Sequence, residues 1–363
     1  MLKLFTPLNP GIPDGILSYY DWLGINHEKY KQCTDIDEVL KQDLKVACIS
    51  VQPFVDINST LNFDLSLFDL VLVSDIEFNS LESINSWLNK LKVKNHLLAL
   101  GQTNFSKMPD NVIYRPWWSF NILNNNQFQD SNNTDKPLLF DILLGARKSH
   151  RDFIMAKMQK SLLLKKSIVN YRDIFFPRNF ILPAVEKEID NILNGDPLWF
   201  PYVSENLDPT WEVADNLTNA ISSIVPWKFY QQTKYSVLSE TIGDGAFFFS
   251  EKPAKIMFAK RLFVVFSSHG YLENIKRLGF KTFDGIVDES YDNIVDPVQR
   301  YTKAFEQLEY LSTLDYDTIK DQIAEIAEYN YQQLLLLQQQ KRNQMLQMVD
   351  TAIFNITGMR VPG

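Results

Sequence analysis

Short apolar runs that alternate with amphipathic segments constrain the fold of this chain most. Three such runs, LKVACISV, DLVLVS and HLLALG, lie near residues 44–51, 69–74 and 96–101. Between the last two, the segment SLESINSWLNKLKV spaces its apolar side chains as one face of a helix does. Strands that alternate with helices form parallel sheets with right-handed connections. The first part of the chain therefore predicts an α/β domain.

The same pattern restarts after a polar stretch. Residues 124–137, NNNQFQDSNNTDKP, are rich in asparagine and end in proline, as linkers and long surface loops do. PLLFDILLG (137–145) then predicts a strand, and residues 150–164 predict an amphipathic helix. We expect one α/β domain over residues 1–125 and a second over residues 136–310.

The C-terminal part has a different pattern. From residue 315 to residue 350 the sequence contains no proline or glycine, and its apolar residues recur at intervals of three and four. This pattern predicts one long helix that packs along the protein's own domains. The run QQLLLLQQQ leaves open a homodimer that forms through the same helix.

Composition excludes several classes of protein. The 363 residues include 36 basic and 44 acidic side chains, and the net charge of −8 disfavours binding to nucleic acid through phosphate neutralisation. Two cysteines and four histidines show no spacing typical of a disulfide framework or a metal site. We find no apolar run long enough to span a membrane and no signal-like start, so we expect a cytoplasmic protein. Glycine-rich dinucleotide and P-loop motifs are also missing from the sequence.

One charged loop interrupts the apolar second half. The segment SETIGDGAFFFSEK (239–252) lies between two apolar runs and precedes PAKIMFAK, so it predicts the loop of a βαβ unit at the ligand-binding edge of a sheet. Lys252 could contact phosphates at a helix start, and Glu240 could accept hydrogen bonds from sugar or ribose hydroxyls. The alternative is an ordinary capping carboxylate beside an exposed lysine.

A second charged motif, GARKSHR (145–151), follows an apolar strand and opens a helix. Cations at a helix N-terminus oppose the helix dipole unless a bound anion compensates, and a diphosphate would do so. The alternative is that these side chains point into solvent. Two Asp-x-Asp triplets, at 35–37 and 315–317, have the form that holds a metal in one class of sugar transferases, but their positions predict solvated surface. Together, the two charged motifs favour a nucleotide-sugar pocket without a metal.

The order of these motifs resembles the donor domain of fucosyltransferases that use GDP-fucose. That family has an arginine at the first helix start, a Phe-Glu-Asn triplet, and Thr-Glu-Lys after a short glycine-bearing loop. Arg151, Glu240 and the pair Glu251–Lys252 match these positions, although the triplets here read Ser-Glu-Thr and Ser-Glu-Lys. The following segment, KRLFVVFSSHGYLENIKRLGFKTFDGIVDESYD, is similar to virus- and phage-encoded glycosyltransferase-like proteins. The resemblance covers roughly residues 138–300, and the changed triplets put fucose in more doubt than a nucleotide sugar.

The first half resembles the family more faintly. FDLVLVSDIEF resembles the strand and acidic loop that carry the family's catalytic carboxylate, and YRPWW resembles its Arg-x-Pro-aromatic element. The resemblance implies a GT-B fold, in which two Rossmann-like domains face each other across a cleft. It implies inverting, metal-independent transfer from a GDP-linked sugar to a glycan acceptor, with no other cofactor. We expect the protein in the cytoplasm, which for a virus-encoded protein is that of the infected host cell.

The resemblance also implies a role for each candidate residue. Arg151 and Lys252, with Arg147 as an auxiliary, would neutralise the diphosphate, and Glu240 would hold the ribose or the sugar. Glu251 would orient Lys252 or touch the sugar. The base would be Glu77, with Asp75 as the second candidate. Two alternatives remain open: a non-catalytic binding or structural protein with the same two domains, and a transferase of another sugar.

Overall fold

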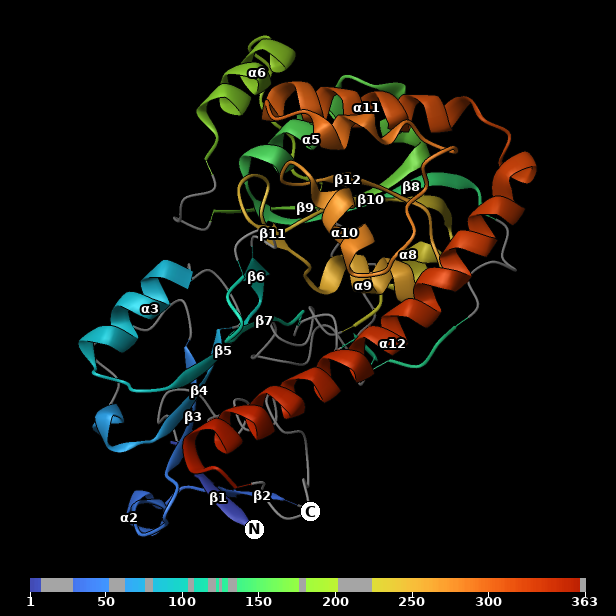
Figure 1. Cartoon of the computed structure of the whole chain (residues 1–363). Helices are drawn as coiled ribbons and strands as arrows, with labels where there is room; N and C mark the ends of the chain where they lie inside the picture. Colours follow the sequence, from blue (N-terminus) through green and yellow to red (C-terminus); the bar gives the residue numbers. More distant parts are fainter. Residues whose placement is uncertain are drawn as a thin grey trace. The chain divides into compact units, whose positions relative to one another are not determined.

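A computed structural model describes most of the chain, and it forms two compact units (Figure 1). The described residues are 1–7, 29–51, 63–75, 81–103, 108–116, 122–123, 126–129, 136–175, 181–201 and 224–359. The first unit contains residues 1–117 together with 337–363, and the second contains residues 118–336. Each unit holds one parallel sheet, so the predicted α/β class with two Rossmann-like sheets is confirmed.

The sheet of the first unit has the strand order β2-β1-β3-β4-β5-β7, and every neighbouring pair is parallel. The strands are β1 (Leu2–Phe5), β2 (Tyr30–Cys33), β3 (Val46–Val51), β4 (Leu70–Asp75), β5 (His96–Leu100) and β7 (Val112–Tyr114). The three apolar runs form β3, β4 and β5, as predicted. The chain passes from β1 to β2 on one side and then to β3 on the other, which places a topological switch point between β1 and β3.

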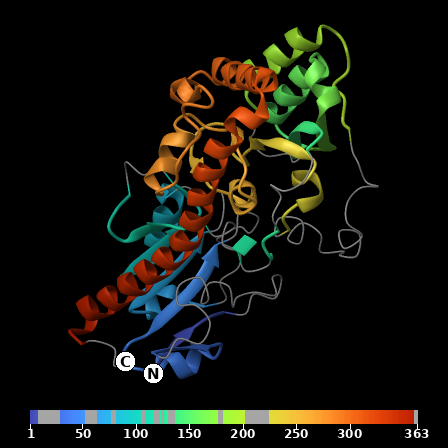
Figure 2. The same ribbon diagram turned by 90° about the vertical axis from the view of Figure 1, so that its right-hand side faces the viewer.

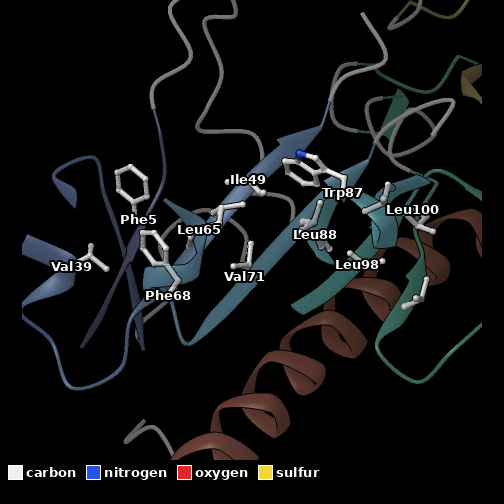
Figure 3. Close-up of a cluster of buried hydrophobic side chains, with 14 of the residues drawn as sticks. Phe5, Val39, Ile49, Leu65, Phe68, Val71, Trp87, Leu88, Leu98 and Leu100 are labelled. Atoms are coloured by element: carbon white, nitrogen blue, oxygen red, sulfur yellow. The ribbon is translucent and has the colours of Figure 1, made fainter. Parts of the chain in front are cut away.

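Both faces of this sheet are buried. Successive residues of a strand point to opposite faces, and all six residues of β4 are buried. Ala47 and Ile49 of β3 pack with Trp87 of α3 (Leu81–Lys90) and Val39 of α2 (Ile36–Leu40) on one face, shown in Figure 3. Val46 and Cys48 face the other side. There the cover comes from the far end of the chain, with Met345, Val349 and Ile353 in the same cluster.

These three residues belong to α12 (Tyr316–Thr357), a helix of 42 residues. The predicted long C-terminal helix is confirmed, and it extends seven residues beyond the expected end at residue 350. Its earlier part is anchored in the second unit, where the buried Asn330 accepts a hydrogen bond from Lys281 N (2.8 Å) and donates one to Lys281 O (2.9 Å). The buried positions of α12 therefore lie against the protein's own cores.

The sheet of the second unit has the order β12-β10-β8-β9 and is also parallel throughout. Its strands are β8 (Leu138–Arg147), β9 (Ser167–Phe175), β10 (Thr233–Ser239) and β12 (Phe263–Phe266). The chain leaves β8 for β9 on one side and returns to β10 on the other. The switch point of this sheet therefore lies between β8 and β10, and the carboxyl ends of these two strands are where such a sheet binds ligands.

Among the described residues, six α-helices of the second unit accompany its sheet, besides the earlier half of α12. They are α5 (Ser149–Gln159), α6 (Pro183–Leu193), α8 (Trp227–Tyr230), α9 (Glu251–Phe258), α10 (Tyr271–Arg277) and α11 (Pro297–Thr313). Figures 1 and 2 show α5 and α11 over one face of the sheet and α8 and α9 on the other. The predicted helix over residues 150–164 ends earlier, at Gln159. The Ser161 hydroxyl accepts a hydrogen bond from Leu163 N (3.2 Å) and begins a separate 3₁₀ turn. In the described part of the chain, no helix is both long and apolar enough to cross a membrane.

A buried ion pair fixes the middle of this second sheet. Asp141 of β8 and Arg261 are each about 2% exposed, and Arg261 Nη2 donates to Asp141 Oδ2 at 2.8 Å. The same carboxylate oxygen accepts from the hydroxyls of Thr233 (3.0 Å) and Ser236 (2.9 Å), both on β10. The ion pair and these two hydroxyl contacts tie β8 to β10 below the switch point.

We predict that Asp141→Ala destabilises the protein by about 3–5 kcal/mol, because it leaves the Arg261 guanidinium buried without its counter-charge. Urea denaturation would measure this loss as a lower free energy of unfolding. The matched control is Lys303→Ala, which removes an exposed pair with Glu306 (2.6 Å) and should cost about 0–1 kcal/mol. Equal stability of the two variants would contradict the role of the buried pair.

Candidate functional site

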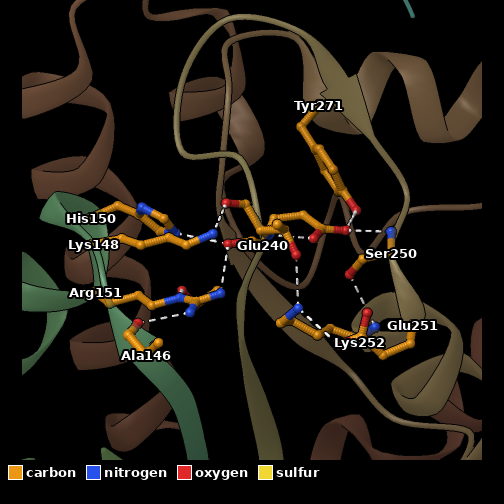
Figure 4. A network of polar contacts seen from close by, with 11 residues as sticks. Ala146, Lys148, His150, Arg151, Glu240, Ser250, Glu251, Lys252 and Tyr271 are labelled. Carbon is orange, nitrogen blue, oxygen red and sulfur yellow. Dashed lines mark hydrogen bonds and ion pairs between the residues drawn. The ribbon is translucent and has the colours of Figure 1, made fainter. Parts of the chain in front are cut away.

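The loops that follow β8 and β10 meet at the switch point of the second sheet (Figure 4). β8 ends at Arg147, and α5 begins at Ser149 after Lys148. β10 ends at Ser239, and the loop of residues 240–250 leads to α9, whose N-cap hydroxyl on Ser250 accepts from Lys252 N (3.2 Å). Each loop therefore delivers basic side chains at the start of a helix.

Glu240 closes the loop at both of its ends. Its carboxylate Oε2 accepts from Thr241 N (2.5 Å), and Oε1 accepts from Ser250 N (2.8 Å) and from the Tyr271 hydroxyl (3.0 Å). The residue is fully buried. A carboxylate has about four acceptor positions, and three of them are used here within the protein. The predicted contact with ribose or sugar remains a prediction, and the contacts seen in the structure are those of a group that shapes the loop.

The backbone carbonyl of Glu240 binds two further side chains. His150 Nε2 donates to it at 2.8 Å and Arg151 Nη2 at 3.2 Å. Burial, together with the charges of Arg151 and Lys148, holds the pKa of His150 well below its usual range. Because the acceptor is a carbonyl, the neutral ring carries its proton on Nε2.

Three more side chains hold the next three carbonyls of the loop. The donors are Lys148 Nζ to Thr241 O (2.6 Å), Ser267 Oγ to Ile242 O (2.9 Å) and the Tyr301 hydroxyl to Gly243 O (2.5 Å). A trans peptide directs its carbonyl and the following N–H in opposite directions. The amides that follow these carbonyls therefore point away from the side chains that hold the loop.

Arg151 is the most enclosed cation of the site, with 4% of its surface exposed. Besides Glu240 O, it donates to Ser239 Oγ (3.2 Å) and Ala146 O (2.8 Å). Among the described residues no carboxylate lies within ion-pair distance of it. Burial lowers the pKa of Arg151, and nearby Tyr171 and the carboxylates oppose this effect. An arginine stays protonated in any such setting, so the site keeps this charge without a direct counter-ion.

Lys252 is more accessible. About 24% of its side chain is exposed, and its ammonium donates to Thr241 Oγ1 and to Glu251 Oε1, both at 2.9 Å. Burial raises the pKa of Glu251, but the stronger combined effect of Lys252 and Lys255 lowers it to about 2. Lys255 follows Glu251 by one helical turn, and burial lowers its pKa to about 8. At neutral pH, Glu251 is therefore ionised and Lys255 is mostly charged.

Basic side chains outnumber acidic ones among the described residues that come together at this edge. We call six residues the switch-point cluster: Lys148, Arg151, Glu240, Glu251, Lys252 and Lys255. It contains four cations and two carboxylates, in a chain whose net charge is −8. Because most of the cluster is buried, solvent screens the surplus poorly, and a bound anion would compensate it.

The other predicted residues lie elsewhere. Arg147 forms ion pairs with Asp152 (2.9 Å) and Asp173 (3.4 Å), and its guanidinium lies over the Phe200 ring. Asp75 is the last residue of β4 in the first unit and is 3% exposed. Glu77 lies outside the described residues. Four of the predicted residues, Arg151, Glu240, Glu251 and Lys252, come together in the switch-point cluster.

Four contributors to this site were not predicted: Lys255, Ser267, Tyr271 and Tyr301. Lys255 could have been found, because it lies four residues after Glu251 on the predicted helix. Tyr271 and Tyr301 reach the loop from α10 and α11, and no local pattern marks either tyrosine. Both Asp-x-Asp triplets lie at helix starts, where the first aspartate accepts backbone N–H groups. No group of side chains suited to a metal occurs among the described residues.

No family model matches this chain, and no curated protein matches it. Among solved structures, the chain is similar to the DNA-modifying enzyme β-glucosyltransferase, whose structure was determined in the presence and absence of uridine diphosphoglucose. The TM-score is 0.41 with 10% sequence identity, over 97% of this chain and 98% of that one. A likeness at this level carries no information about activity.

We predict that Gly243→Ala destabilises the protein by about 1–3 kcal/mol, the usual cost of overpacking. A Cβ at this position would lie 2.5 Å from His150 Nδ1 and 3.1 Å from the Tyr301 hydroxyl. Thermal unfolding measures the loss. In a His150→Ala background the same glycine substitution should cost less, because the ring that it strikes is gone. An equal cost in both backgrounds would contradict this packing.

Proposed function

We propose that the protein is a glycosyltransferase that uses a nucleoside diphosphate sugar, and that the donor's diphosphate binds at the switch-point cluster. The observation that carries this proposal is the buried Arg151 guanidinium at the carboxyl ends of β8 and β10, which has no carboxylate within ion-pair distance among the described residues. A parallel sheet offers a ligand site at this place, and a diphosphate has the charge that the cluster lacks.

Lys252 is the residue best placed to contact the phosphates. An ammonium has three N–H groups, and two of them are used by Thr241 Oγ1 and Glu251 Oε1. The third would donate to a phosphate oxygen, with the N-terminus of α9 adding the positive end of its dipole. Glu251 holds the ammonium in place, which agrees with the orienting role expected for it.

Arg151 and Lys148 would act on the diphosphate through their positive charge, from the side of the loop on which they bind its carbonyls. Both are almost fully buried and are held by backbone carbonyls, so their positions are fixed before the donor binds. Fixed positive charge stabilises the diphosphate that leaves when the sugar is transferred. Glu240 is a positioning residue in this proposal, because its carboxylate joins the two ends of the loop.

The chemistry would be inverting, with a carboxylate of the first unit removing the acceptor's hydroxyl proton while the sugar–diphosphate bond breaks. Glu77 remains our choice for this base. Asp75 is a weaker choice, because a 3% exposed side chain offers little access to an acceptor. We propose a GDP-linked sugar, with fucose as the first candidate, and a glycan as the acceptor, because the motifs resemble the GDP-fucose family.

We predict that Lys252→Gln weakens the binding of a nucleoside diphosphate by about 1.5–3 kcal/mol, roughly ten- to a hundredfold in Kd, because it removes a charge-assisted hydrogen bond. Calorimetry with GDP, UDP, CDP and ADP, and then with their sugar conjugates, gives both the affinity and the preferred base. Lys303→Gln on the exposed face of α11 is the control and should bind as the wild type does. If no diphosphate binds the wild type, the proposed function is wrong.

We also predict that Glu77→Gln abolishes sugar transfer while donor binding stays within about twofold of wild type, because a general base acts on the acceptor and not on the donor. Turnover of the donor that calorimetry identifies would be assayed beside its Kd. A fully active Glu77→Gln variant would place the base elsewhere. Donor binding by a wild type that never turns over would instead favour the non-catalytic binding protein.

A further inference from the structure

A hollow of about 370 Å³ lies at the edge of the second sheet that is opposite to the switch-point cluster. Ser167, the first residue of β9, and Gln232, which directly precedes β10, are among its lining residues. The seven residues of β10 separate the two places by about 20 Å, at roughly 3.3 Å per residue. The hollow is within the usual size range of small-molecule sites and is distinct from the proposed donor site.

Trp199 forms one wall of this hollow on a fixed backbone. The backbone N–H of Trp199 donates to Gln159 Oε1 (3.0 Å), and Gln159 Nε2 donates to Pro197 O (3.0 Å). Two residues later, Pro201 O accepts from Tyr171 N (2.8 Å). Trp199 as a whole nevertheless remains 53% exposed. A large aromatic ring held in solvent beside a hollow is a ready surface for a flat ligand.

The remaining lining decides between a sugar and an aromatic ring. Most of it is apolar, and we call Leu164, Ile168, Val169, Pro201 and Phe229 the apolar floor. Ser167 and Gln232 add two polar side chains. A sugar ring carries hydroxyls all around its edge, and those that face the apolar floor instead of Ser167, Gln232 or Lys228 would lose their water without gaining hydrogen-bond partners. A flat apolar ring has no such cost and gains from the burial of its faces.

One lining residue is charged, and it is a cation. Lys228 is exposed, and among the described residues its ammonium has no ion-pair partner. Gln232 Nε2 donates to the Lys228 carbonyl (2.7 Å), which fixes the backbone that presents this lysine. A negative group on the ligand would pair with this lysine. The lining residues include no carboxylate that could pair with a cationic ligand.

We propose that this hollow is a binding site for an aromatic carboxylate, with the ring against Trp199 and the apolar floor and the carboxylate on Lys228. The site does not depend on the glycosyltransferase proposal, because it shares no residue with the switch-point cluster. It adds a second small-molecule site to the same unit.

The test is calorimetry on the full chain with 2-naphthoate and with the neutral 2-naphthamide. We expect both to bind with a stoichiometry of one, and Trp199→Ala to weaken both by roughly tenfold. Lys228→Gln should weaken 2-naphthoate by roughly fivefold or more and leave 2-naphthamide within about twofold, because only the carboxylate senses the charge. Lys165→Gln, at an exposed lysine outside the lining, should change neither.

Filling the hollow gives an independent test. Ile168→Trp should abolish binding of both probes, and its melting temperature should equal that of Lys303→Gln. If the Ile168→Trp variant fails to fold, the Trp199 and Lys228 variants still decide. Three results would overturn the proposal: no saturable binding of 2-naphthoate, equal affinity in Trp199→Ala, or an equal effect of Lys228→Gln on both probes. Glucuronate binding more tightly than 2-naphthoate would overturn it in favour of a site for acidic sugars.

Discussion

The carbonyl oxygen of Glu240 accepts hydrogen bonds from both His150 and Arg151, and the edge of the second sheet depends on this contact. It joins the start of α5 to the end of β10 across the switch point. From this fixed point the loop continues with each of the next three carbonyls held by a side chain. Buried carbonyls require partners, so this row of donors determines the path of the loop and, through Glu240 and Ser250, the start of α9.

The choice of partner matters for the charge of the site. Arg151 donates to carbonyls, which satisfy its N–H groups but do not cancel its charge. In the same unit Arg261 and Arg147 differ from Arg151, because each has a carboxylate partner at 2.8–2.9 Å. Burying a charge without a counter-charge costs free energy. The chain accepts this cost for Arg151, where a parallel sheet binds ligands, and avoids it for Arg261 in the middle of the sheet.

Much of the architecture follows from local sequence. The runs LKVACISV, DLVLVS and PLLFDILLG predict strands because central parallel strands are apolar on both faces. β2 was missed for the opposite reason: in YKQC only Tyr30 and Cys33 are buried, and its polar middle carries no strand signal. At the site, the cations of GARKSHR and SEK were predictable from their positions at helix starts. Their partners were not, because Tyr271, Ser267 and Tyr301 reach the loop only through tertiary packing. The ion pair of Arg147 with Asp173 depends likewise on the pairing of β8 with β9.

The first sheet has a requirement that no local pattern shows. One of its faces is covered by Met345, Val349 and Ile353, more than 250 residues after most of the strands that they cover. Asp350 adds polar contacts here, accepting from the Tyr30 hydroxyl and from Lys29 Nζ (3.2 Å). Burial and the Asp350 carboxylate together raise the pKa of Tyr30, so this hydroxyl stays protonated and remains a donor. Among the described residues, α12 covers this face of the sheet, so one buried core joins residues as far apart as Leu4 and Ile353. The earlier half of the same helix belongs to the second unit.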